Sequence, residues 1–145
     1  MDVSDKVIKV LENFQTPPNI KLALLWASLM FLYIYNDYFS LYVPGQIARI
    51  AEGRLGPLGP ATQGALIGVS LLLALPSLMV FLSVALPALA SRWLNILFGL
   101  LYTAVEVLTS GGSFWFYRIT VGLEIILSVL IVWTALRWPK KVVAG

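Results

Sequence analysis

Three acidic residues lie in or beside long apolar runs, a setting in which carboxylates can bind cations or pass protons. They are Asp37, Glu106 and Glu124. Glu124 stands ten residues into the last apolar run, which places it about 15 Å along a helix axis and near the middle of a membrane. A carboxylate at that depth costs about 2.5 kcal/mol or more unless it is protonated, paired or hydrated. Glu124 is therefore the strongest candidate for a functional residue.

Each of these acids belongs to a polar stripe that repeats at helical spacing, so its members share one face of a helix. The stripes of the first, third and fourth apolar runs are, in that order, Tyr33, Asn36, Asp37 and Ser40; Asn95, Gly99, Tyr102, Glu106 and Thr109; and Tyr117, Thr120, Glu124 and Ser128. Polar faces of membrane helices turn away from lipid. We therefore expect the three stripes to meet inside the protein, in its outer half.

The stripes allow two interpretations. In the first, they form an outward-opening polar pocket that binds a cationic or polar ligand, or passes protons. The residues of that pocket are Tyr33, Asn36, Asp37, Tyr102, Glu106, Tyr117, Arg118 and Glu124. In the second, the same groups only join helices by hydrogen bonds, with Arg118 in a salt bridge near the outer interface. The sequence leaves both interpretations open.

The residue types that are missing exclude much other chemistry. The chain has no Cys and no His, so thiol chemistry, disulfides, Cys/His zinc sites and an imidazole base are excluded. We expect no cofactor, no metal site and no catalytic set, and an intramembrane enzyme working with two carboxylates is the least favoured function. Nucleic-acid binding is not expected either, because the net charge of +3 forms no continuous basic patch.

The composition indicates the environment of these residues. Hydrophobic residues make up 59% of the 145 and charged residues only 12%, about half the share found in soluble domains. A soluble globule of this size could not hide that much apolar surface. We therefore predict an all-α integral membrane four-helix bundle that forms one domain over residues 1–145, with the lipid bilayer as its surroundings.

The elements follow from apolar periodicity and its interruptions. Membrane spans are predicted at about residues 20–42, 63–86, 90–109 and 114–138. Residues 1–15 predict an amphipathic helix on the membrane surface, not a cleavable signal, and residues 46–52 a short interfacial helix between the first two spans. Thr62 is placed to cap the second span. Pro76 inside that span frees a carbonyl, which a neighbour or a water must satisfy.

Four residues are expected to serve helix packing. Gly64 and Gly68 have the small-xxx-small spacing that lets two helices approach closely, either within one bundle or across a homodimer. Asn95 is expected to form a hydrogen bond between helices, and Gly99 lies one turn further along the same stripe.

The basic residues predict the orientation. With four spans both termini lie on one side, which then holds seven basic residues against three on the other. The three are Arg49, Arg54 and Arg118. The positive-inside rule therefore predicts that both termini lie in the cytoplasm and that the long connection faces outward. The membrane is expected to be the cell membrane, which is the inner membrane in cells that have two membranes.

Four stretches carry a resemblance to a known family. They are residues 21–26 (KLALLW), 33–45 (YIYNDYFSLYVPG), 92–96 (RWLNI) and 131–139 (IVWTALRWP), with residues 36–41 the most specific. The chain resembles, over about residues 19–139, small bacterial and archaeal four-helix membrane proteins known only as a domain of unknown function. The resemblance implies the four-span architecture and no activity. A looser likeness to DoxX-like membrane proteins is one of architecture alone.

The favoured function is thus binding of a small polar or cationic ligand, or a lipid, in an outward-facing pocket, with proton linkage. The alternative is an accessory or structural subunit that docks on a larger membrane complex.

Overall fold

The structure is a computed structural model that describes residues 14–111 and 114–140, apart from the Pro57 side chain. Its long helices are α1 (Pro18–Ser40), α3 (Gln63–Ala85), α4 (Ala88–Thr109) and α5 (Trp115–Leu136). A short helix, α2 (Gln46–Ala51), and a single 3-10 turn, η1 (Gly56–Leu58), connect α1 to α3. Each long helix is long and apolar enough to cross a membrane. The predicted four-helix membrane bundle is therefore confirmed.

Local sequence signals explain where the helices begin and end. Pro18 occupies the first turn of α1, where its missing N–H costs no helical hydrogen bond. Thr62 caps α3 as predicted, because its Oγ1 accepts a hydrogen bond from the Ala65 N–H at 3.2 Å. Gly45 precedes α2 with φ of 79°, a left-handed conformation that favours glycine. Pro139 disfavours a helical conformation at the preceding residue, and α5 ends at Leu136, two residues earlier than expected.

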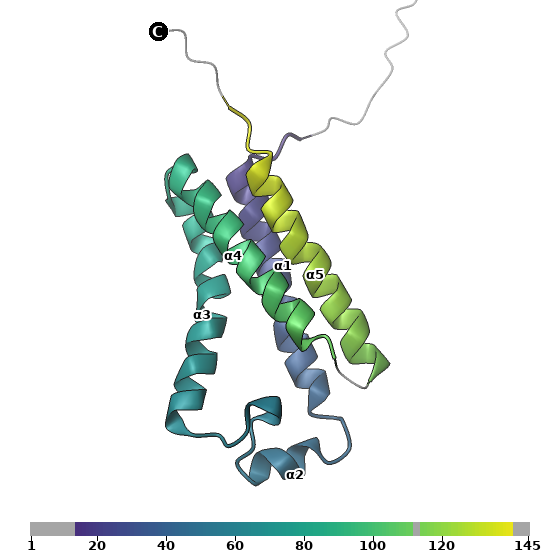
Figure 1. The fold of residues 1–145 in the computed structure, drawn as a ribbon. Helices are drawn as coiled ribbons and strands as arrows, with labels where there is room; N and C mark the ends of the chain where they lie inside the picture. The colour runs from purple at the N-terminus through teal and green to yellow at the C-terminus, as the bar shows by residue number, and fades with distance from the viewer. Residues whose placement is uncertain (1–13, 112–113, 141–145) are drawn as a thin grey trace, which may run out of the picture.

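The four long helices run alternately up and down (Figure 1). The bundle has a terminal end, where α1 begins and α5 finishes, and a loop end, which carries α2 and the connection from α4 to α5 (Figure 1). Helix α1 packs against both α3 and α5, and α4 packs mainly against α5. The apolar core lies toward the terminal end, around the fully buried side chains of Leu22, Trp26 and Ile131.

Helix α3 is the least enclosed of the four. Its buried residues, Pro76, Met79 and Ser83, all lie in its C-terminal half. Toward the loop end α3 diverges from α1 and α4 (Figure 1). The N-terminal half of α3 therefore contributes no buried residue to the bundle.

Two expectations concern surface helices. The amphipathic helix expected over residues 1–15 falls almost wholly outside the described part of the chain. The short helix between the first two spans is present as α2, and none of its residues is buried.

Candidate functional site

Two carboxylates from neighbouring helices lie buried in the loop half of the bundle. Glu106 is on α4 and Glu124 on α5, and each is only 3% exposed. Glu124 stands nine residues after Trp115, so it lies about 13 Å along the axis from the loop end. Among the described residues the one ion pair joins Arg54 to Glu52 in the α2 to α3 connection. Neither buried carboxylate is therefore neutralised by a described basic side chain.

Glu106 is held by hydrogen bonds from two other helices. The Tyr33 hydroxyl of α1 donates to its Oε1, and the Ser128 hydroxyl of α5 donates to its Oε2 at 2.7 Å. The Thr103 hydroxyl, one turn before Glu106, lies 2.9 Å from Ser128 Oγ. Both oxygens of Glu106 thus have a donor, as an ionised carboxylate requires when it is buried.

Glu124 is held less completely. Asn36 Nδ2 of α1 donates to its Oε1 at 3.2 Å. Asn36 is itself 8% exposed, and its Oδ1 has no hydrogen-bond partner among the described residues. A buried amide oxygen without a donor is unusual, because leaving it unsatisfied costs about 1–3 kcal/mol. Glu124 and Asn36 together therefore present more acceptors than donors.

Tyr102 has a structural partner rather than an open pocket in front of it. Its hydroxyl donates to the backbone carbonyl of Leu72 on α3. That carbonyl lies four residues before Pro76, so it is the acceptor that the proline leaves without an N–H. The Tyr102 ring also lies 6.4 Å from that of Tyr33, centroid to centroid, next to the acid pair.

The remaining predicted site residues lie toward the loop end. The Asp37 side chain is exposed, which differs from the buried position expected for it, yet it is close enough to act electrostatically on the Glu124 carboxylate. The Tyr117 hydroxyl donates to the Thr109 carbonyl at 3.3 Å. Arg118 is exposed beside the Trp115 ring, 5.7 Å from its centroid.

A second polar cluster lies in the terminal half and joins three helices. Trp26 Nε1 donates to Asn95 Oδ1 at 2.7 Å, and the Ser83 hydroxyl donates to the same oxygen at 3.1 Å. Asn95 Nδ2 in turn donates to the Ser91 carbonyl at 2.8 Å. All the polar atoms of the Asn95 amide are thus engaged within the chain, so here the polar groups act as helix-joining contacts. The contribution of Ser83 and Ser91 was not expected, because serines at single positions give no periodic signal.

The glycines expected to serve packing behave differently from one another. A Cβ on Gly99 would lie 2.7 Å from Val132 Cγ2, so α4 and α5 meet closely there. Around Gly64 and Gly68 nothing lies within 4 Å of such a Cβ. Close packing of that pair inside the bundle is therefore not found, because α3 diverges at this level.

The main surface grooves of the described chain stop short of the acid pair. Five grooves of the described chain are lined mainly by apolar side chains, and neither Glu106 nor Glu124 lines any of them. The groove nearest the loop end holds about 400 Å³ between α1 and α5 and includes Thr120, one turn from Glu124.

The fold and the two buried acids define a four-helix membrane bundle with an acidic site between α1, α4 and α5. The chain belongs to the family of unknown function DUF6326, which matches residues 8–145. The match thus begins eleven residues before Asn19, the start of the resemblance noted from the sequence. Comparisons with curated proteins and with solved structures give no match.

Proposed function

We propose that this membrane protein binds a small cationic ligand at the acidic site and releases a proton as it does so. The observation that carries the proposal is the burial of Glu106 and Glu124 without a described basic partner. Buried charges are neutralised by pairing or by proton uptake, because desolvating a carboxylate costs several kcal/mol. A proton and a bound cation are therefore alternative occupants of one site.

The hydrogen bonds divide the roles between the two acids. Glu106 accepts from Tyr33 and Ser128, so each of its oxygens already has a donor. Glu124 and the unpartnered Oδ1 of Asn36 supply the acceptors that a ligand would use. Acceptors of this kind favour a cation that carries N–H donors, such as a small ammonium.

The route to the site is proposed to open at the loop end. Asp37 is exposed and interacts electrostatically with Glu124, so it would draw a cation toward the buried acids. The Tyr117 hydroxyl, which donates to the Thr109 carbonyl, is a further polar group at this end.

Purified protein in detergent tests the proposal with methylammonium as the probe. Methylammonium should raise the thermal unfolding midpoint of the native chain and release protons that a dye detects in weakly buffered solution. The Glu124→Gln variant should show neither effect. Tetramethylammonium, which has the same charge and no N–H donor, should act only weakly on the native chain.

Glu52→Gln is the matched control, since Glu52 is exposed in the loop and pairs with Arg54 at 3.8 Å. It should respond to methylammonium as the native chain does. Equal responses of the Glu124→Gln and Glu52→Gln variants would overturn the proposal. The comparison of the two variants requires that the Glu124→Gln protein is folded, which a cooperative unfolding transition of that variant shows.

We also propose the cell membrane as the location, with both termini in the cytoplasm. The support is the excess of basic residues on the side of the termini.

The open face of α3 favours a second function, that of an accessory subunit. Gly64 and Gly68 face open space on a helix that is buried only in its C-terminal half. Small residues at this spacing suit contact with another membrane helix. Gly68→Cys in the naturally cysteine-free chain should then crosslink in native membranes, to a second copy or to a partner. A protein that stays a monomer and forms no crosslink would contradict this function.

A further inference from the structure

A groove runs along the contact between α1 and α5, and neither Glu106 nor Glu124 lines it. It consists of two adjoining stretches, of about 310 and 340 Å³, that share Ser28. The first stretch runs from Lys21 and Thr134 to Ser28, and the second from Ser28 to Leu32 and Leu123. Because α1 and α5 are antiparallel, this order follows both helices from the terminal end toward the middle of the bundle.

The length of the groove fits one leaflet of a bilayer. Lys21 and Leu32 are eleven residues apart on α1, or about 16 Å along its axis. One leaflet contributes about half of a hydrocarbon core that is about 30 Å thick. The groove is therefore as long as a single acyl chain that starts at the terminal end.

The terminal end of the groove is basic. Lys21 lines the groove itself, and Arg137 follows Thr134 by one turn of α5. The Arg137 guanidinium lies 4.0 Å from the centroid of the Trp133 ring, an aromatic residue of the kind that anchors at the headgroup level. Lys140 comes directly after Pro139 and is exposed. Three cations thus lie at the end of the bundle where a lipid phosphate would sit, and Lys21 is the one that lines the groove.

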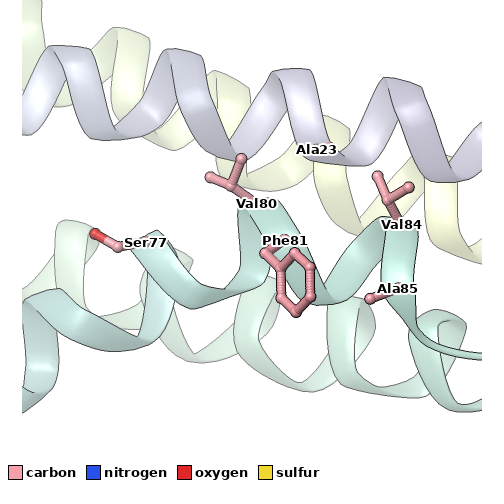
Figure 2. Close-up of a pocket in the computed structure, with 6 residues that line it drawn as sticks. All are labelled: Ala23, Ser77, Val80, Phe81, Val84 and Ala85. Carbon is pink, nitrogen blue, oxygen red and sulfur yellow. The ribbon is translucent and has the colours of Figure 1, made fainter.

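The groove between α1 and α3 provides a contrast. It holds about 530 Å³, and its six lining residues are Ala23, Ser77, Val80, Phe81, Val84 and Ala85. Val80 and Val84 point from α3 toward α1 (Figure 2). None of its lining residues is charged. This groove can receive any acyl chain and has no means of selecting a headgroup.

We infer that the groove between α1 and α5 is a binding site for one anionic phospholipid. The acyl chain lies along Ser28 and the apolar side chains around it, and the phosphate lies between Lys21 and Arg137. Basic pockets between membrane helices bind anionic headgroups in this way, because the attraction adds to the apolar contact. The site is separate from the acid pair and does not depend on the proposed function.

Native mass spectrometry of the full chain in detergent tests the inference with phosphatidylglycerol and phosphatidylcholine of equal chain length. Phosphatidylglycerol should be retained at least several-fold more than phosphatidylcholine. The Lys21→Gln/Arg137→Gln variant should lose that preference. The Arg49→Gln/Arg54→Gln variant removes the same charge from the connection at the loop end and should keep it.

Two further measurements distinguish binding of a lipid from simple attraction of an anion to the basic residues. Ser28→Leu fills the middle of the groove and should lower phosphatidylglycerol retention with all cations intact, whereas Ser77→Leu in the groove of Figure 2 should not. Inorganic phosphate should not raise the thermal unfolding midpoint as phosphatidylglycerol does. Equal retention of the two lipids, unchanged retention in Ser28→Leu, or an equal effect of phosphate would each overturn the inference.

Discussion

The hydroxyl of Tyr102 on α4 donates to the backbone carbonyl of Leu72 on α3. Pro76 cannot supply the N–H that this carbonyl would receive in an uninterrupted helix, and bilayer lipid offers no replacement donor. One side chain therefore makes a proline tolerable in the middle of a membrane helix. The same ring packs beside Tyr33, whose hydroxyl holds Glu106. Helix α3 and the acidic site are thus linked through two tyrosines.

Tyr102→Phe should lower the free energy of unfolding by about 1 kcal/mol, because it leaves the Leu72 carbonyl without a donor. In a Pro76→Ala background the same change should cost much less, since an alanine at that position supplies the missing backbone N–H. Unfolding in mixed micelles with increasing denaturing detergent measures both values as a double-mutant cycle. Equal losses in the two backgrounds would contradict the assignment of this hydrogen bond.

Gly99→Ala should destabilise the protein by about 1–3 kcal/mol, because the added methyl group would overlap Val132 and push α4 from α5. Gly64→Ala and Gly68→Ala are the matched controls in the same unfolding experiment. They meet no neighbour and should change the stability of the isolated chain by no more than about 0.5 kcal/mol, or raise it through better helix propensity. A similar loss at all three positions would argue against the divergence of α3.

Asn95→Ala should cost about 1–3 kcal/mol, because it leaves the Trp26 N–H without its acceptor inside the core. Asn19→Ala, in the first turn of α1, is the comparison at a site that is not fully buried. It should change stability by no more than about 0.5 kcal/mol. Thermal unfolding followed by tryptophan fluorescence reports both variants, and a neutral Asn95→Ala would show that this network adds little.

Single cysteines in the cysteine-free chain should reveal the orientation. We expect Glu52→Cys to react in intact cells with a maleimide that does not cross membranes, and Lys140→Cys to react only after the cells are opened. Denatured samples labelled in parallel give the total number of reactive thiols. The reverse pattern would place the termini outside.

The sequence contained enough information for the architecture and for part of the site. Apolar run length predicts the four spans, and helical spacing put Tyr33, Asn36, Glu106 and Glu124 on faces that the structure brings together. Periodicity fixes the direction of a side chain around its own helix. It does not fix how far neighbouring helices stand apart.

The differences between the expected and the observed site arise because spacing along one helix does not fix the distance to its neighbours. Asp37 follows Asn36 directly, and the turn of about 100° between them is enough to leave one side chain exposed and the other buried. Gly64 and Gly68 have a packing motif without a partner inside the described chain, because α3 diverges where they lie. The role of Tyr102 required knowing which carbonyl on another helix faces it. Each of these relationships joins two helices, so the residue pattern of a single helix does not reveal it.

The buried residues of α3 all lie from Pro76 onward. In a membrane, its first two turns would therefore be surrounded by acyl chains more than by the described protein. The thickness and stiffness of the host bilayer therefore act directly on the position of this helix, and preparations in different lipid mixtures should differ there more than anywhere else in the described chain.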